Sequence, residues 1–118
     1  MLKRHIATVL AIAITMLTPQ AGVNWFNDGL TIHKETYYNL NMDKVILTAK
    51  QKGIVANYWI REDGMKMYGD YIIVAANQKH HPYGSIVMTS RGAGIVLDTG
   101  SFAKKNPEQY DLAVNWRG

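Results

Sequence analysis

The chain contains no cysteine. This absence excludes disulfide bonds, thiolate metal sites and a cysteine nucleophile. Charged residues are also few, at 19% of the chain against 47% hydrophobic residues. That balance excludes a disordered chain, and a length of 118 residues indicates one domain with a single core.

An excess of charge of one sign is also missing. The net charge is +4, but Lys3 and Arg4 supply part of it, which leaves 11 basic and 9 acidic residues in the remainder. The basic residues are scattered and do not form a stripe. We therefore expect no nucleic-acid partner.

No apolar run reaches the roughly 20 residues that a membrane-spanning helix needs. The longest, "IATVLAIAITML" at 6–17, has 12 residues and follows the basic residues Lys3 and Arg4. This pattern is typical of a signal peptide. We expect residues 1–22 to be a signal peptide or an N-terminal membrane anchor, the protein to be exported, and any membrane contact to involve this segment alone. The alternative is an N-terminal core helix.

The remainder of the chain predicts a mainly β fold. Residues 23–42 are interpreted as a linker or arm. Good helix formers at about 43–53 predict one short helix, which Gly53 ends. Short apolar runs separated by turns then predict strands at 54–60, 70–76, 85–90, 95–97 and 111–116. Most of these runs are apolar on both faces, which favours a small closed barrel.

Two aspartates stand where strands end and begin. Asp98 directly follows "IVL" and precedes Thr99 and Gly100, so it either projects into a cleft or caps a turn. Asp111 opens the last strand, and a strand-loop-strand return can bring both carboxyls to the same end of a barrel. Neighbouring carboxyls push their pKa values apart, so that one stays protonated and acts as a general acid. The alternative for Asp111 is a solvated residue at a strand start.

The remaining polar motifs are weaker signals. Adjacent residues on a strand point to opposite faces, so the histidines at 80 and 81 are not expected to bind one metal ion together. We interpret them as loop residues. "RGAG" at 91–94 lacks a following helix and is interpreted as a hairpin turn. Glu62 and Asp63 most simply occupy a turn. Several aromatic residues either stack on sugar rings or belong to the core: Tyr37, Tyr38, Tyr58, Trp59 and Tyr68.

The stretch "GIVLDTGSF" at 94–102 resembles the Asp-Thr-Gly loop of aspartic proteases. A chain with one such loop works as a protease only in a homodimer, and it must build most of a β-barrel after the loop. Only 18 residues follow Gly100. The position of the motif therefore counts against a homodimeric aspartic protease.

A second resemblance fits both the motifs and their order. The stretch 69–116 resembles the 3D (three-aspartate) domain of bacterial cell-wall proteins of the stationary-phase survival type and of the catalytic barrel of lytic transglycosylase A. The motifs that carry it are "IVAAN" (73–77), "HPYGS" (81–85), "GIVLDTG" (94–100) and "YDLAVNW" (110–116). The resemblance implies a six-stranded double-psi β-barrel at 43–118, an extracellular or cell-wall location, and peptidoglycan glycan strands as the partner.

The implied activity is that of a peptidoglycan lytic transglycosylase, which needs no metal or cofactor. By this analogy Asp111 is the acid/base and Asp98 its supporting neighbour, with the roles open to exchange. Asn77, Thr99 and Gly100 would bind substrate or brace the site. The first of the family's three aspartates is replaced by Asn77, which cannot ionise. A non-catalytic cell-wall binding module on the same barrel is therefore the alternative.

Overall fold

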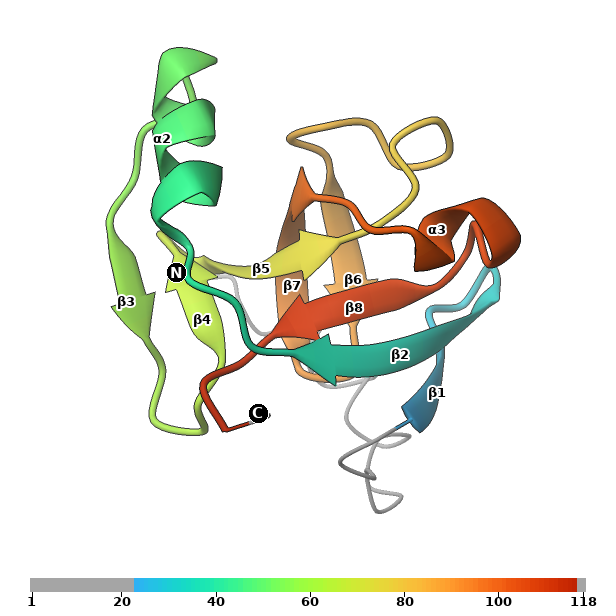
Figure 1. The fold of residues 1–118 in the computed structure, drawn as a ribbon. Helices are drawn as coiled ribbons and strands as arrows, with labels where there is room; N and C mark the ends of the chain where they lie inside the picture. Colours follow the sequence, from blue (N-terminus) through green and yellow to red (C-terminus); the bar gives the residue numbers. More distant parts are fainter. Residues whose placement is uncertain (1–22, 117–118) are drawn as a thin grey trace.

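The computed structural model describes residues 23–116, which form eight strands and two helices (Figure 1). The strands are β1 (Val23–Asn27), β2 (Ile32–Tyr38), β3 (Tyr58–Ile60), β4 (Lys66–Tyr68), β5 (Tyr71–Ala75), β6 (Ile86–Thr89), β7 (Gly92–Asp98) and β8 (Tyr110–Ala113). The helices are α2 (Asp43–Gln51) and α3 (Phe102–Lys105). The expected signal peptide or anchor at 1–22 lies outside the described residues. Within 23–116, neither helix has the length and apolar character to cross a membrane.

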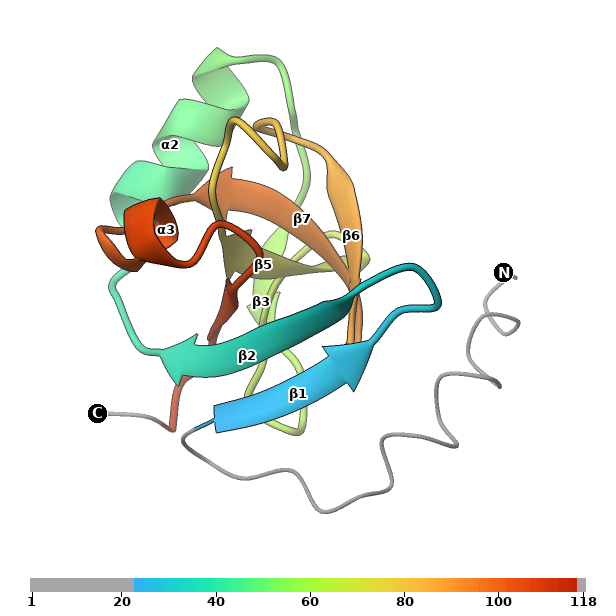
Figure 2. The same cartoon turned by 90° about the vertical axis from the view of Figure 1, so that its right-hand side faces the viewer.

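Strand β5 organises the sheet. Ile72 pairs with both β4 and β7, and Val74 pairs with both β7 and β8. Strand β7 therefore runs along one edge of β5, while β4 and β8 share the other edge in succession. The β5–β7 and β2–β8 pairs are parallel and the others are antiparallel. Figure 2 shows β1 beside β2, with which it pairs in antiparallel orientation. The other edge of β2 pairs with β8.

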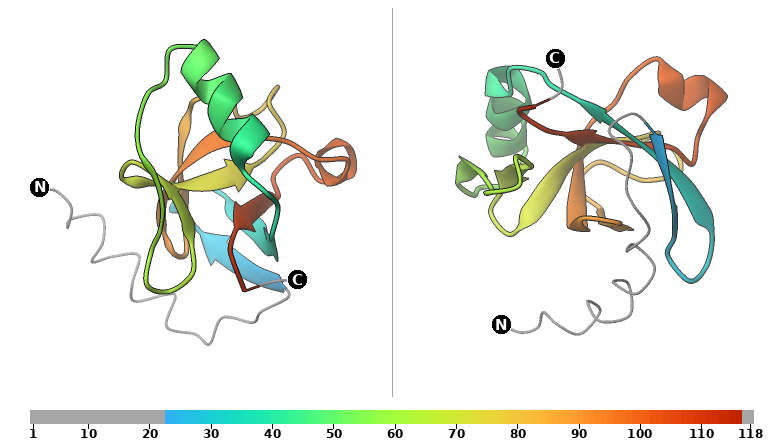
Figure 3. Two further views of the ribbon diagram at one scale, coloured as in Figure 1. Left: turned by 60° about the vertical axis from the view of Figure 1, so that its left-hand side comes forward. Right: turned by 90° about the horizontal axis from the view of Figure 1, so that it is seen from below.

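Alternation along the strands separates two buried clusters. In β8, Tyr110 and Leu112 belong to the interior cluster, whereas Ala113 belongs to a second cluster on the opposite face. The second cluster lies against α2 (Figure 3). It combines helix residues with strand residues: Met42, Val45, Ala49, Tyr68, Ile73, Ile95, Leu97 and Ala113. The sheet is thus apolar on both faces where α2 covers it.

The position of α2 follows from its sequence. Asn41 Oδ1 accepts a hydrogen bond from the Asp43 N–H at 2.8 Å, and Asp43 places a negative charge in the first turn. Val45 and Ala49 are four residues apart, so both side chains face the sheet, where they are buried. Gly53, with φ +87°, ends the helical segment in a conformation that glycine adopts without strain.

Several expectations from the sequence are confirmed. The fold is mainly β, and the helix expected at about 43–53 is α2. The strands expected at 70–76 and 85–90 are β5 and β6, and "REDG" lies in the β3–β4 turn. The hairpin turn expected at 91–94 is shorter, because Ser90 and Arg91 form it and Gly92–Gly94 belong to β7. The number of strands is a correction, because the described chain has eight and not six.

The interpretation of residues 23–42 as a linker or arm is wrong. This segment forms β1 and β2, and β2 is hydrogen-bonded to β8, so the sheet is not confined to residues 43–118. The alternation in β2 was hidden because two of its three buried residues are polar: His33, Glu35 and Tyr37. A period-2 pattern is recognised by apolar residues on the buried face, and β2 buries polar ones instead.

The described strands form an open sheet, since no backbone ladder joins β6 to β1 or β2. Side chains bridge this gap instead. Ser90, in the β6–β7 turn, donates from its N–H to Glu35 Oε2 at 2.8 Å and from its hydroxyl to Glu35 Oε1 at 2.5 Å. Asn24 Nδ2 donates to Ser90 Oγ at 3.2 Å. The β1–β2 hairpin is therefore tied to the β6–β7 hairpin across the open side of the sheet.

The β5–β7 contact yields a prediction about stability. A Cβ added at Gly94 would lie 2.6 Å from Val74 Cγ2 and 3.1 Å from the Ile72 carbonyl oxygen. Gly94→Ala should therefore lower the free energy of unfolding by about 1–3 kcal/mol, measured by urea denaturation. Gly100→Ala is the control, because its Cβ would meet only the Phe102 ring, at 3.0 Å. Equal stability of the two variants would contradict this account of the packing.

Candidate functional site

The two aspartates singled out in the sequence lie on the same face of the sheet. Ala75, near the end of β5, has Asp98 of β7 as its partner on one side and Asp111 of β8 on the other. The β5–β7 register shifts just before the Ala75–Asp98 pair, so this pairing alone does not fix the direction of Asp98. Thr36 and Tyr38 project to one face of β2 and hydrogen-bond to Asp111 and Asp98, so the two carboxyls lie on that face. Neighbouring strands are about 4.8 Å apart, so the two aspartate α-carbons are separated by about 10 Å. Ala75 is the residue between them in the register, and we call Asp98, Ala75 and Asp111 the aspartate row.

Asp98 is held by its neighbours in a defined orientation. Its Oδ2 accepts a hydrogen bond from the Tyr38 hydroxyl at 2.8 Å, and its Oδ1 accepts from the Thr99 N–H at 2.9 Å. Its backbone carbonyl accepts from the Ala76 N–H at 3.1 Å and from Gln78 Nε2 at 3.3 Å. The side chain is half-buried. Both oxygens of Asp98 are thus oriented by donors on β2 and on its own loop.

Asp111 is oriented by a short relay from β2. Thr36 is its register partner on β2 and donates from Oγ1 to Asp111 Oδ1 at 2.9 Å. Gln109 Nε2 in turn donates to Thr36 Oγ1 at 2.8 Å, which directs the threonine hydroxyl toward the carboxyl group. Asp111 is half-buried. The aspartate row therefore continues through Thr36, and β2 supports both carboxyls.

Tyr38 connects the two carboxyls electrostatically. Burial raises the pKa of the Tyr38 hydroxyl, and the charge of Asp98, the hydrogen bond to Asp98 and the charge of Asp111 raise it further, well beyond the usual range. The hydroxyl therefore keeps its proton and acts as a donor at every physiological pH. Because both negative charges act on it, Tyr38 belongs to the same site as Asp98 and Asp111.

The three expected substrate-binding residues lie in the loops beside this row. Asn77 Oδ1 accepts from the N–H groups of Lys79 and His80 at 2.9 and 3.1 Å, and its Nδ2 donates to the Ala103 carbonyl at 3.0 Å. Asn77 thus braces the β5–β6 loop against α3, and the donated bond requires an amide where a carboxylate has no proton to give. Thr99 is exposed and Gly100 is half-buried, next to Asp98.

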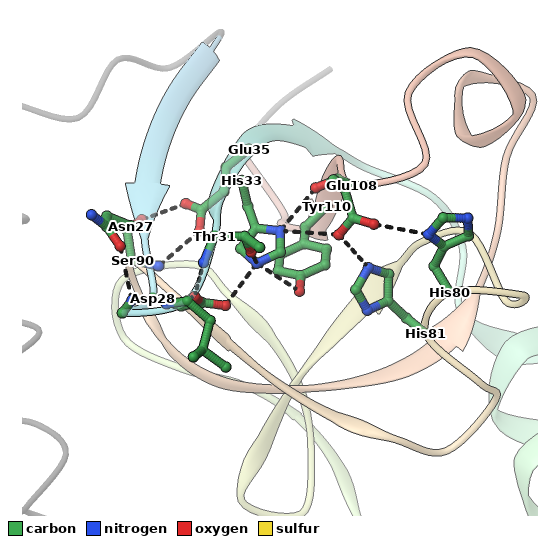
Figure 4. A network of polar contacts seen from close by, with 12 residues as sticks. Asn27, Asp28, Thr31, His33, Glu35, His80, His81, Ser90, Glu108 and Tyr110 are labelled. Atoms are coloured by element: carbon green, nitrogen blue, oxygen red, sulfur yellow. Dashed lines mark hydrogen bonds and ion pairs between the residues drawn. The ribbon is translucent and has the colours of Figure 1, made fainter.

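A second polar cluster, which the sequence did not reveal, surrounds the buried side chain of His33 (Figure 4). His33 Nε2 lies 2.7 Å from Asp28 Oδ2, and His33 Nδ1 lies 3.0 Å from the Glu108 carbonyl oxygen. Each ring nitrogen of His33 is therefore directed toward an oxygen that accepts hydrogen bonds. The ring also stacks on Tyr110, with the centroids 4.3 Å apart.

Glu108 extends this cluster to the β5–β6 loop. Its Oε2 is 2.9 Å from His80 Nδ1, and its Oε1 is 3.1 Å from His81 Nε2 (Figure 4). The two adjacent histidines therefore each contact one oxygen of the same carboxylate. The expected loop position of His80 and His81 is confirmed. Within residues 23–116, no group of three or more His, Asp or Glu side chains has an arrangement suited to a metal ion.

The cluster around His33 connects three loops and does not form a nucleophilic triad. Thr31 Oγ1 and Asp28 Oδ2 both contact the same ring nitrogen of His33, Nε2, each at 2.7 Å, whereas a triad needs its nucleophile and its carboxylate on opposite nitrogens. The connected segments are the β1–β2 turn, the β5–β6 loop and the segment between α3 and β8. Because Asn77 and Asp111 border these segments, the cluster holds the surroundings of the aspartate row in place.

Comparisons of the chain with protein-family models, curated proteins and solved structures found no significant match.

The carboxyls of the cluster around His33 make the free energy of unfolding depend on pH in the acid range. Burial acts to raise the pKa of Asp28, but the N–H groups of Thr31 and Leu30 and the His33 ring outweigh it and hold that pKa below its usual value. Burial also acts to raise the pKa of Glu108, but His80, His81 and His33 outweigh burial, so this pKa is lowered as well. A carboxyl whose pKa is lower in the folded than in the unfolded state stabilises the fold above the unfolded-state pKa, which is about 4. This stabilisation is lost as the pH falls through the folded-state pKa.

We therefore expect the free energy of unfolding to decrease between about pH 5 and pH 3. The double variant Asp28→Asn/Glu108→Gln should lose less stability over this range, measured by urea denaturation at a series of pH values. Asp70→Asn, which removes an exposed carboxyl in the β4–β5 turn, is the control and should behave like the unsubstituted protein. An acid dependence unchanged in the double variant would show that this cluster does not cause it.

Proposed function

We propose that the protein is an exported peptidoglycan lytic transglycosylase. It would cleave the bond between N-acetylmuramic acid and N-acetylglucosamine and leave a 1,6-anhydro-muramic acid end. The observation that carries the proposal is the aspartate row, in which Asp98 and Asp111 flank Ala75 on one sheet face. These are the two carboxyls that the resemblance to the 3D domain implies, and they come from the strands that the resemblance implies.

The proposed scaffold is a double-psi β-barrel. Two features of the described strands support it. The β5–β7 and β2–β8 pairs are parallel within a sheet of otherwise antiparallel pairs, and parallel pairs need crossover connections, as the proposed barrel would. The bonds from Ser90 to Glu35 then draw the two open ends of the sheet toward each other. Residues 1–22 would direct export to the cell wall.

In the proposed reaction Asp111 acts as the acid and then as the base. Its carboxyl proton moves to the glycosidic oxygen, and the bond from that oxygen to C1 of the muramic acid breaks. The Asp111 carboxylate then takes the proton of the sugar's own 6-hydroxyl, and O6 bonds to C1 to close the anhydro ring. The step consumes no water and needs no metal or cofactor. It differs from hydrolysis, in which two carboxyls act on a water molecule or on a covalent intermediate.

Asp98 is the supporting carboxyl in this scheme. Its negative charge disfavours ionisation of Asp111 and stabilises positive charge that develops at C1. The Tyr38 hydroxyl, which keeps its proton, fixes Asp98 Oδ2 by the 2.8 Å hydrogen bond. The Thr36 hydroxyl orients the Asp111 carboxyl in the same way. Thr99 and Gly100, at the exposed side of Asp98, are the proposed contacts with the glycan.

The test is digestion of purified glycan strands between pH 4 and pH 8, followed by mass spectrometry. We expect 1,6-anhydro-muropeptides from the unsubstituted protein. Asp111→Asn should reduce their rate of formation by about 100-fold or more, since general acid–base catalysis contributes a factor of that size. Asp70→Asn should retain activity. Failure of the folded protein to produce anhydro-muropeptides at any pH would contradict the proposal, as would an active Asp111→Asn variant.

A non-catalytic cell-wall binding module is the second candidate, and Asn77 is the observation that favours it. The residue that replaces the family's first aspartate is committed to the loop by three hydrogen bonds and carries no charge. Retention of the protein on insoluble peptidoglycan, with no turnover and with binding unchanged by Asp111→Asn, would support this candidate over the enzyme.

A further inference from the structure

A hollow lies at the opposite end of the sheet from the aspartate row. It has a volume of about 620 Å³ and is lined by Trp59, Arg61, Glu62, Asp63 and Arg91. These residues come from β3, the β3–β4 turn and the β6–β7 turn, which lie together at the lower side of Figure 1. Strand β7 begins after Arg91 and ends at Asp98, so the length of this strand, about 20 Å, separates the hollow from the row.

The only aromatic side chain that lines the hollow is both exposed and fixed. Trp59 is 44% exposed, although an indole ring of this size is usually covered. Its Nε1 donates a hydrogen bond to the Gly69 carbonyl at 2.8 Å, which fixes the orientation of the ring. A ligand that packs on this ring therefore finds an apolar surface whose side-chain freedom is already restricted, so binding costs little conformational entropy.

Charged groups of both signs line the same hollow and are joined to one another. Arg61 donates from Nε and Nη2 to the two oxygens of Asp63 at 2.9 Å each, and Nη2 also reaches the Arg91 carbonyl. Arg91 lies over the rings of Tyr37 and Trp116, with its Nη1 3.8 Å from Asp63 Oδ2. At this distance Arg91 and Asp63 form an ion pair but no direct hydrogen bond. The lining thus offers guanidinium donors and carboxylate acceptors together with one aromatic side chain.

From this arrangement we infer that the hollow is a saccharide-binding subsite with Trp59 as its stacking platform. A pyranose ring presents an apolar C–H face, which packs on an aromatic ring, and a rim of hydroxyls, which both donate and accept. A lining of one aromatic side chain with charged donors and acceptors matches both requirements. An apolar peptide side chain would instead need an apolar pocket, and none of the residues that line the hollow is aliphatic.

The identity of the saccharide rests on the proposed function, which makes it an N-acetylated amino-sugar polymer. A second contact with the same polymer, about 20 Å from the aspartate row, would raise the overall affinity because the second contact becomes intramolecular. Binding at the hollow itself requires neither Asp98 nor Asp111. The two ideas therefore fail separately.

The experiment is a titration of the protein with a soluble oligomer of N-acetylglucosamine, followed by two-dimensional amide and indole NMR. We expect shifts of the Trp59 indole N–H and of the backbone amides of Arg61 and Arg91. Trp59→Ala should weaken binding by about tenfold or more, because it removes the stacking surface. Trp25→Ala is the matched control, since Trp25 is 63% exposed on β1 and does not line the hollow. This variant should bind the oligomer as the unsubstituted protein does.

A dispersed spectrum of Trp59→Ala, with unchanged signals from β5 and β8, verifies that this variant is folded. Arg91→Ala provides a second variant that leaves the indole in place and should also weaken binding. Shifts confined to Trp25, or equal affinity of Trp59→Ala and the control, would overturn the inference. Saccharide binding that depends on Trp59 without any glycan cleavage would support the subsite and refute the transglycosylase. Glycan cleavage that is unchanged in Trp59→Ala and Arg91→Ala, without saccharide binding that depends on Trp59, would support the transglycosylase and refute the subsite.

Discussion

The double pairing of β5 is the constraint on which the rest of the structure depends. At its end β5 is hydrogen-bonded to β7 on one side and to β8 on the other, and Ala75 is therefore flanked by an aspartate on each side. The two aspartates are 13 residues apart in the sequence, and no local interaction would bring them together. The same pairing separates the interior cluster from the cluster beneath α2. Core and candidate site are thus consequences of one register.

The polar interior of the β1–β2 hairpin performs a task that apolar residues perform elsewhere in the fold. Glu35 is fully buried, and burial raises its pKa, although hydrogen bonds from Ser90 and Asn24 and the charge of His33 oppose the rise. A buried carboxyl of this kind is tolerated because its oxygens are hydrogen-bonded. Ser90, which donates to both oxygens of Glu35, lies on the other hairpin, so these two bonds offset the cost of burial only when the two hairpins meet. The polar side chains therefore specify how the open sheet curves.

The sequence predicted those parts of the molecule in which local pattern and tertiary role agree. The apolar runs of β5 and β6, the helix α2 and the turns around Asp63 and Arg91 all follow from residue type and spacing. Strand β2 did not, because His33 and Glu35 place polar groups on its buried face. Asp98 and Asp111 were identified from their positions at strand ends. Tyr38 and Thr36, which orient them, could not be, because their roles depend on the parallel pairing of β2 with β8.

The proposed catalytic site and the proposed saccharide subsite lie at opposite ends of one sheet. The central claim is that Asp98 and Asp111 act as one electrostatic unit. The most direct measurement is a carbon-13 NMR titration of the Asp111 carboxyl in the unsubstituted protein and in Asp98→Asn. The account predicts that removal of the Asp98 charge lowers the pH at which Asp111 ionises, because a neighbouring negative charge no longer opposes ionisation. An identical titration midpoint in the two proteins would contradict it.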